Sequence, residues 1–127
     1  MEKQLKSVKE FHEKFLHPVS ETPTLSVNGE LRHKLMAEEN DEYLLAVEKG
    51  DLIEVADALG DQLYILCGTI LTHGMQHIIE DVFDEIQKSN MSKLGSDGKP
   101  VYREDGKIIK GPDYMSPNLK PIVENEK

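Results

Sequence analysis

The sequence predicts an all-α protein, a bundle of four main helices followed by a short C-terminal β-hairpin. Apolar residues recur at helical spacing through the first 94 residues, whereas glycine and proline crowd the remainder. The 127 residues, 38% hydrophobic and 31% charged, suffice for one core. We therefore expect a single domain over 1–127, helical over 1–94, with a Gly/Pro-rich tail over 95–127.

The first two predicted helices span residues 3–16 and 30–49. Apolar residues at helical spacing mark the first helix, and Pro18 and Pro23 follow it in a loop. The second segment contains no glycine or proline, and Gly50 follows it where a helix terminator is expected. The first half of the chain thus reads as helix, loop, helix.

The third predicted helix runs from Leu52 to about Thr72, with Asp51 as its N-cap and Glu54 placed as in a capping box. It is apolar nearly all round, which requires more cover than three other helices supply, so we expect a homodimer or homotetramer. The fourth helix runs from about 75 to 93 and is amphipathic.

No helix is expected after Leu94, because eight glycines and prolines interrupt the tail. Within it, Asp105-Gly106 is the signal for a two-residue type I′ turn, in which both positions require positive φ. The sequence therefore predicts a hairpin over 101–110. A lone hairpin is marginally stable, so it should pack on helices or on another subunit.

The net charge of −9 argues against binding to nucleic acid or to an anionic membrane through a basic surface. No apolar run approaches the roughly 20 residues of a membrane span. The single Cys67 forms no intramolecular disulfide, and the first residues do not resemble a secretory signal, so a reduced cytoplasm is expected. Cys67 and His12 both lie on apolar faces and are expected to be packed structural residues.

Carboxylates occupy unexpected positions in the second and third predicted helices. Residues 37–61 hold nine acidic residues and one basic residue. On the second helix, Glu38 and Glu42 fall on the same stripe as its leucines, with Glu39 beside them. On the third, the acids of residues 52–76 line one side opposite the leucines and are not accompanied by lysine or arginine. These acids are Glu54, Asp57 and Asp61.

Converging carboxylates without a cation repel one another or become protonated, and burying them unpaired is costly. An all-oxygen ligand set suits Mg²⁺ or Mn²⁺. The spacings Glu39-x-x-Glu42 and Glu54-x-x-Asp57 place two carboxylates on adjacent turns of one face. The alternative is that Glu54 only caps its helix and that the other glutamates are solvent-facing charges.

The acidic pattern resembles a known superfamily. Residues Glu38 to Glu42 followed by Glu54 to Asp57 resemble the E-E-x-x-E and E-x-x-D motifs of the all-α nucleoside triphosphate pyrophosphohydrolases, which include MazG proteins, phosphoribosyl-ATP pyrophosphohydrolase and dimeric dUTPases. The resemblance runs from about Leu31 to Pro121. In the segment 89–112 it is greatest with the phosphoribosyl-ATP pyrophosphohydrolase branch.

The resemblance implies Mg²⁺-dependent hydrolysis between the α- and β-phosphates of a nucleotide, giving a monophosphate and pyrophosphate. It implies Glu39, Glu42, Glu54 and Asp57 as metal ligands and Glu38 as the base that deprotonates water. Burial on the leucine stripe would raise the pKa of Glu38, and a nearby cation would lower it.

The remaining candidates surround this motif. We expect Asp61, one turn past Asp57, to accept a hydrogen bond behind the ligands, although direct ligation and helix packing stay open. Asn90 and Lys93 continue the apolar stripe of the fourth helix and are candidates to contact phosphate or sugar, unless the helix simply ends there. Candidates for the leaving pyrophosphate are Lys99, Arg103, Lys107 and Lys110.

The tail and the N-terminal helix depart from a minimal phosphoribosyl-ATP pyrophosphohydrolase, so dUTP or another non-standard nucleotide is the preferred substrate. Phosphoribosyl-ATP hydrolysis in histidine synthesis is the alternative within the enzyme class. A hypothesis from another class is a non-catalytic helical oligomer whose acids bind a structural cation or a basic partner.

Overall fold

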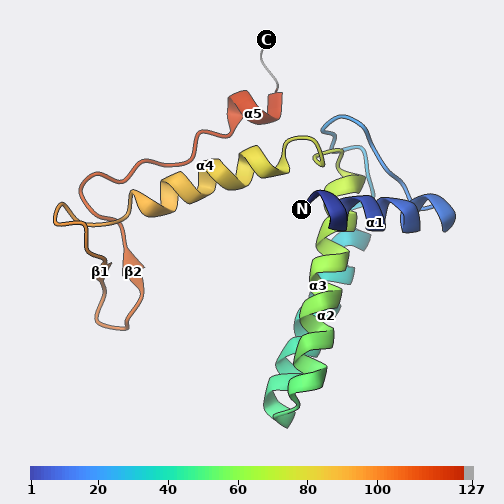
Figure 1. Ribbon diagram of the computed structural model, residues 1–127, viewed down its shortest axis with the longest axis horizontal. Coiled ribbons are helices and arrows are strands. Elements are labelled where there is room, and N and C mark those ends of the chain that lie inside the picture. Colours follow the sequence, from blue (N-terminus) through green and yellow to red (C-terminus); the bar gives the residue numbers. More distant parts are fainter. Residues whose placement is uncertain (125–127) are drawn as a thin grey trace. The chain divides into compact units, whose positions relative to one another are not determined.

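The computed structural model describes residues 1–124 and confirms the all-α prediction (Figure 1). The chain divides into two compact units, Met1–His77 and a second that begins at Ile78. None of the helices described has the length and apolar character needed to cross a membrane. The elements are α1 (Glu2–Lys14), α2 (Gly29–Lys49), α3 (Leu52–Thr72), α4 (Ile79–Met91), β1 (Val101–Tyr102), β2 (Ile108–Ile109) and α5 (Lys120–Glu124).

Helices α2 and α3 form an antiparallel hairpin with a very short connection. Gly50 ends α2 in the left-handed conformation, at φ 67°, which a residue without a Cβ adopts at little cost. Asp51 caps α3, its Oδ1 accepting hydrogen bonds from the backbone N–H groups of Ile53 and Glu54. The predicted bounds of α3 are confirmed. The reciprocal half of a capping box is not formed, because the side chain of Glu54 pairs with Lys49 instead.

Helix α1 packs on α3 over a small core, and the buried polar side chains of this unit are His12, Arg32 and Thr72. The Nδ1 atom of His12 is 3.0 Å from the carbonyl oxygen of Pro18, and the Arg32 guanidinium donates to Ile65 O and Thr69 Oγ1. A Cβ on Gly68 would lie 2.7 Å from both His12 Nε2 and Arg32 Nη2, so this close approach requires glycine. The predictions that His12 and Cys67 are packed structural residues are confirmed.

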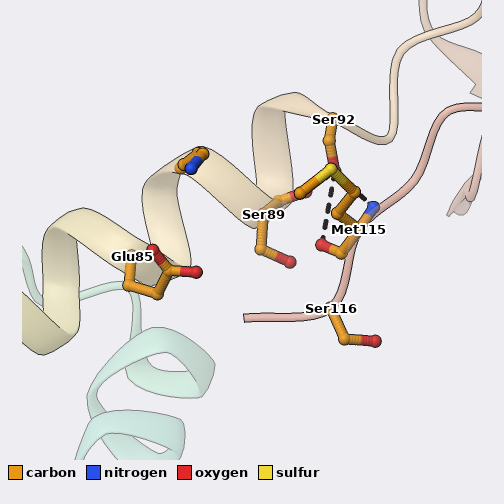
Figure 2. Close-up of a pocket in the computed structure, with 6 residues that line it drawn as sticks. Glu85, Ser89, Ser92, Met115 and Ser116 are labelled. Atoms are coloured by element: carbon orange, nitrogen blue, oxygen red, sulfur yellow. Dashed lines mark hydrogen bonds between the residues drawn. The ribbon is translucent and has the colours of Figure 1, made fainter. Parts of the chain in front are cut away.

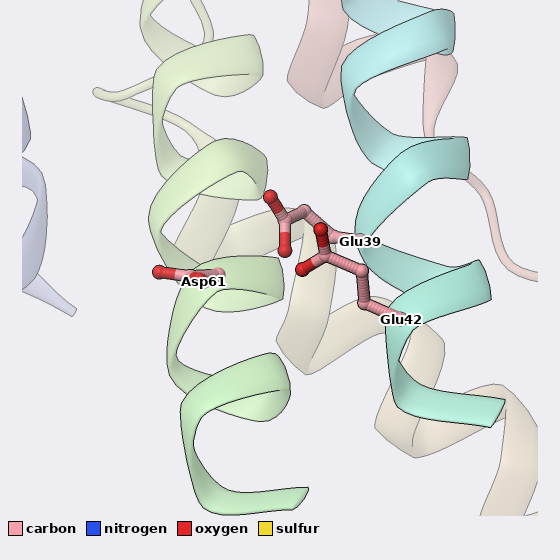
Figure 3. Close-up of side chains that lie close together, drawn as sticks. All are labelled: Glu39, Glu42 and Asp61. Atoms are coloured by element: carbon pink, nitrogen blue, oxygen red, sulfur yellow. The ribbon is translucent and has the colours of Figure 1, made fainter. Parts of the chain in front are cut away.

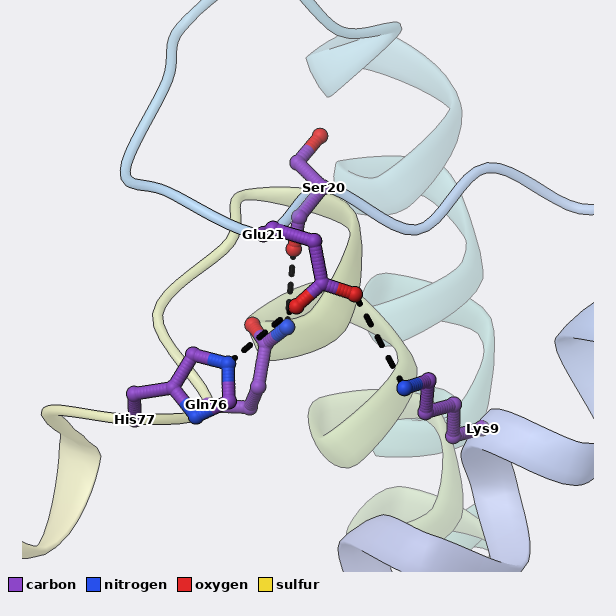
Figure 4. A network of polar contacts seen from close by, with 5 residues as sticks. All are labelled: Lys9, Ser20, Glu21, Gln76 and His77. Carbon is purple, nitrogen blue, oxygen red and sulfur yellow. Dashed lines mark hydrogen bonds and ion pairs between the residues drawn. The ribbon is translucent and has the colours of Figure 1, made fainter.

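Helix α4 begins at Ile79, four residues later than expected, because residues 76 and 77 contact the loop that follows α1. Gln76 Nε2 donates to Ser20 O at 2.8 Å. His77 Nε2 lies 3.2 Å from Glu21 Oε2, and Lys9 Nζ lies 3.7 Å from the other oxygen, Glu21 Oε1 (Figure 4). The His77 hydrogen bond, together with Lys9, lowers the pKa of Glu21. These long-range contacts replace the first helical turn.

The second unit contains α4, the predicted hairpin and α5. The strands pair Val101 with Ile109 and Tyr102 with Ile108. The predicted type I′ turn is wrong, because Gly106 has positive φ and Asp105 does not. Arg103 N donates to Lys107 O and Gly106 N to Arg103 O, which makes a three-residue loop that needs only one left-handed residue.

The chain after the hairpin returns along α4. Asn118 N donates to Glu85 Oε2 at 2.9 Å and Met115 N to Ser92 Oγ at 2.9 Å, beside a small cavity of about 30 Å³ (Figure 2). The expectation of no helix after residue 94 is wrong for the five residues of α5. Proline is compatible with the first turn of a helix, where its missing N–H is not required, and Pro121 occupies that turn.

Candidate metal centre

Three carboxylates from the two helices of the α2–α3 hairpin lie close together (Figure 3). Glu39 and Glu42 come from adjacent turns of α2, and Asp61 comes from the facing side of α3. One oxygen of each lies within 4.8 Å of the others. The hydrogen bond from Gln62 Nε2 to Asn40 Oδ1, 3.1 Å long, fixes the register of the two helices next to these residues. A single hard cation fits such an oxygen cluster.

The electrostatics of Glu39 also point to a cation. Its side chain is half-buried, and its Oε2 atom is buried without a hydrogen-bond partner among the described residues. Desolvation raises the pKa of Glu39, and the negative charge of Glu42, with smaller effects from Asp61 and Asp57, raises it further. A bound divalent cation would satisfy the orphaned oxygen and remove this repulsion.

A cavity of about 250 Å³ adjoins the cluster through Glu42. Glu54 and Asp57 of α3 line it together with Glu42, so all four ligands implied by the resemblance lie along one seam of the hairpin. Lys49 lines the same cavity, and its Nζ lies 3.4 Å from Glu54 Oε2. The seam therefore combines five carboxylates with one amine.

The structure corrects the predicted environment of Glu38. This residue is exposed, outside both the three-carboxylate cluster and the cavity wall, whereas Glu39 is half-buried. The most buried residues of α2 are Arg32 and Ala46, two heptads apart from one another with Glu39 midway. The inward face of α2 is thus turned by one residue from the predicted leucine stripe. Leu31 and Leu45, the ends of that stripe, are exposed.

Sequence reasoning missed Lys49 and left direct ligation by Asp61 open. Asp61 was expected to accept a hydrogen bond behind the ligands, with ligation as an alternative, and one of its carboxylate oxygens lies within 4.8 Å of an oxygen of Glu39 and of Glu42. Its position one turn past Asp57 was the available signal. For Lys49 the signal was that it is the one basic residue among the nine acids of residues 37–61.

The predicted substrate-binding residues belong to the second unit, and their roles stay predictions. Asn90 is exposed at the end of α4, and Lys93 is half-buried. Arg103 is paired with Asp105 at 2.6 Å, and Lys110 Nζ lies 4.7 Å from the centroid of the Tyr114 ring. The other two are Lys99 and Lys107, both exposed.

Comparison with known proteins decides the family. The model of the phosphoribosyl-ATP pyrophosphohydrolase family matches residues 8–90, which include every carboxylate of the seam. The chain belongs to this family. The crystal structure of a "putative NTP pyrophosphohydrolase" from Exiguobacterium sp. 255-15 is similar, with 28% sequence identity and a TM-score of 0.52 over 96% of this chain and 92% of that one. No curated protein matches the chain.

Membership of the phosphoribosyl-ATP pyrophosphohydrolase family confirms the resemblance to the all-α nucleoside triphosphate pyrophosphohydrolases. The protein is accordingly a hydrolase of the pyrophosphohydrolase type. The family match ends at Asn90, before Lys93 and the β1–β2 hairpin. The carboxylate seam therefore lies within the residues that the family model matches, whereas the tail over 95–127 lies beyond them.

Proposed function

We propose that the protein is a Mg²⁺- or Mn²⁺-dependent nucleoside triphosphate pyrophosphohydrolase. It cleaves between the α- and β-phosphates and releases a nucleoside monophosphate and pyrophosphate, and its substrate is dUTP or another non-standard nucleotide. The observation that carries this proposal is the convergence of Glu39, Glu42 and Asp61, in a chain of this family, beside a cavity lined by Glu54 and Asp57.

The carboxylates of the seam would hold the cation, which supplies charge neutralisation for the phosphates. Glu39 and Glu42 provide ligands from α2, and Glu54 and Asp57 provide them from α3. Asp61 lies close enough to Glu39 and Glu42 to complete the set. These carboxylates would fix the position of the cation, and a cation so held would neutralise and orient the phosphate chain for attack by water between the α- and β-phosphates.

Glu38 is proposed as the base that takes a proton from that water. It precedes Glu39 in α2 and is not one of the three clustered carboxylates. Its exposure keeps it accessible to solvent, as a base acting on water requires. Asn90 and Lys93 are proposed to contact phosphate or sugar. The four basic residues of the tail, Lys99, Arg103, Lys107 and Lys110, are proposed for the pyrophosphate.

We also propose a cytoplasmic homodimer or homotetramer that binds a nucleotide and neither nucleic acid nor membrane. The apolar face of α3 supports self-association, because Leu59, Leu63 and Leu66 are each 41–51% exposed. These positions are spaced by four and three residues and share one helical face.

Phosphoribosyl-ATP hydrolysis in histidine synthesis is a second candidate, favoured by the family match over residues 8–90. A non-catalytic helical oligomer that binds a structural cation is the third. The first two candidates predict different substrates and the third predicts no turnover, so one measurement separates them.

The test is pyrophosphate release from a panel of standard and non-standard nucleoside triphosphates, including dUTP, together with phosphoribosyl-ATP. Each substrate is assayed with Mg²⁺, with Mn²⁺ and with excess chelator. Metal-dependent release from a triphosphate supports the proposal and identifies the base and sugar. Release from phosphoribosyl-ATP alone favours the second candidate, and no release from any substrate favours the third.

Replacing Glu38 by Gln tests its role as the base. We expect turnover to fall by a factor of about 10² to 10⁴, the usual contribution of a general base, with cation binding retained. The measurement is kcat beside a Mn²⁺ binding isotherm for the same preparation. Unchanged turnover would exclude Glu38 as the base.

A further inference from the structure

Lys49 has no role in the reaction proposed above. It is the last residue of α2 and the one basic residue among the nine acids of residues 37–61. The left-handed Gly50 and the cap Asp51 reverse the chain within two residues. This turn brings the Lys49 amine to the first turn of α3, where its Nζ lies 3.4 Å from Glu54 Oε2.

The ion pair between Lys49 and Glu54 is built on the wall of the carboxylate cavity. Both side chains line that cavity together with Glu42 and Asp57. The side chains are 63% and 49% exposed, and ion pairs of this kind contribute little to stability because water and salt screen them. Glu54 can therefore exchange its lysine partner for a stronger one at little cost.

We propose that Lys49 changes partner when the cation and the nucleotide bind. While no divalent cation is present, the Lys49 amine pairs with the Glu54 carboxylate. When that carboxylate binds the cation instead, the amine contacts a phosphate oxygen. This inference rests on the proposed function, because it needs a cation at Glu54 and a phosphate in the cavity. Lys49 thereby becomes a substrate-binding residue supplied by the hairpin itself.

The chemistry of the cavity favours this exchange. A carboxylate oxygen binds a doubly charged cation more strongly than an exposed ammonium group. The three carboxylates on the cavity wall, Glu42, Glu54 and Asp57, would each repel a phosphate chain. A lysine ammonium is a compact charge that binds phosphate well, so the amine released from Glu54 has a partner of opposite charge in the same cavity.

Two binding measurements on the full chain test the proposal with Lys49→Ala. Mn²⁺ affinity is followed by the electron paramagnetic resonance signal of free Mn²⁺, and pyrophosphate affinity is measured by calorimetry at saturating Mn²⁺. We expect Mn²⁺ to bind about three- to tenfold more tightly, because a competing positive charge is gone. Pyrophosphate should bind about tenfold more weakly, because it loses one charged contact. Impaired folding would weaken both affinities, so the opposite signs identify the exchange.

Lys14→Ala is the matched control. Lys14 Nζ lies 3.4 Å from Glu10 Oε1 on α1, so this variant removes the same charge from an ion pair of the same length. We expect it to change neither affinity, and Lys49→Arg to retain most of the pyrophosphate affinity.

Suppose that wild-type protein binds Mn²⁺ and that Lys49→Ala has the same Mn²⁺ affinity or the same pyrophosphate affinity as Lys14→Ala. The proposed change of partner at Lys49 is then wrong, and the proposed function stands. If wild-type protein binds no Mn²⁺, the proposed function itself is wrong, and the role of Lys49 falls with it.

Discussion

Individual side chains show how a small core accommodates a histidine and an arginine. His12 and Arg32 are 3% and 6% exposed and approach α3 at Gly68, the position where a Cβ would collide with both. Burial lowers the pKa of His12, opposed by its hydrogen bond to Pro18, and the positive charge of Arg32 lowers it further. The folded protein therefore favours a neutral imidazole at this position.

The buried His12 predicts that stability falls under mildly acidic conditions. The pKa of a free histidine is 6.5 and that of His12 in the folded chain is lower, so below about pH 6.5 the unfolded chain binds the additional proton. The free energy of unfolding should fall as the pH drops below 6.5, by at most about 1.4 kcal/mol per pH unit from this one group. Urea unfolding at pH 7.5 and 5.5 measures the decline.

The variant for this measurement is His12→Gln, whose amide can still donate to Pro18. It should lose less stability than wild type between the two pH values. His33→Gln, on the exposed side of α2, is the control and should decline as wild type does. Equal declines in all three proteins would contradict the role of His12.

At the scale of elements, the α2–α3 hairpin brings carboxylates together, and their repulsion lowers the stability of the fold. Glu39 carries a raised pKa because it is desolvated and faces other carboxylates. A natural protein tolerates such repulsion where function needs it, and replacing the group often stabilises the fold. We therefore expect the folded protein, without a bound cation, to be more stable when one of these carboxylate charges is removed.

We expect Glu39→Gln to raise the stability of the cation-free protein by about 1 kcal/mol. It should also reduce the stabilisation that Mn²⁺ provides, because a ligand has been lost. Thermal unfolding in chelator and in Mn²⁺ measures both effects. Glu38→Gln, at an exposed position outside the cluster, should leave the stability in chelator nearly unchanged. A Glu39→Gln protein that is less stable than wild type in chelator would argue against repulsion at this seam.

At the scale of the whole molecule, the main feature is the exposed apolar surface of the α2–α3 hairpin. The exposed leucines of α3 lie on the side that the sequence places opposite its carboxylates, and Leu44 and Leu45 of α2 are also exposed. Exposed apolar patches of this kind in soluble proteins mark interaction sites. A second copy of the chain is the partner that the proposed homo-oligomer supplies.

Leu63→Glu is predicted to weaken self-association, because it places a charge at the centre of this leucine face. Light scattering during size-exclusion chromatography should give a lower mass for the variant than for wild type at the same concentration. Leu25→Glu is the control, since Leu25 is 89% exposed in the loop between α1 and α2. A wild-type mass equal to one chain would show that the protein does not self-associate.

The sequence by itself determined the features that depend on neighbouring residues. Asp51 and Gly50 located the connection between α2 and α3, because caps and terminators act within a few residues. The E-x-x-E and E-x-x-D spacings placed pairs of carboxylates on single helix faces, and the structure brings Glu39 and Glu42 together as expected. Local periodicity was sufficient for these inferences.

Only the tertiary structure decided which face of each helix turns inward. Adjacent helical residues differ by 100° in direction, so the contact between α2 and α3 determined that Glu39 is half-buried and Glu38 exposed. Asp61 and Lys49 joined the seam through the register of two antiparallel helices, which no local spacing specifies. The later start of α4 likewise followed from contacts across 56 residues between Gln76 and Ser20. Contacts between distant segments made these choices, and short-range sequence patterns do not encode them.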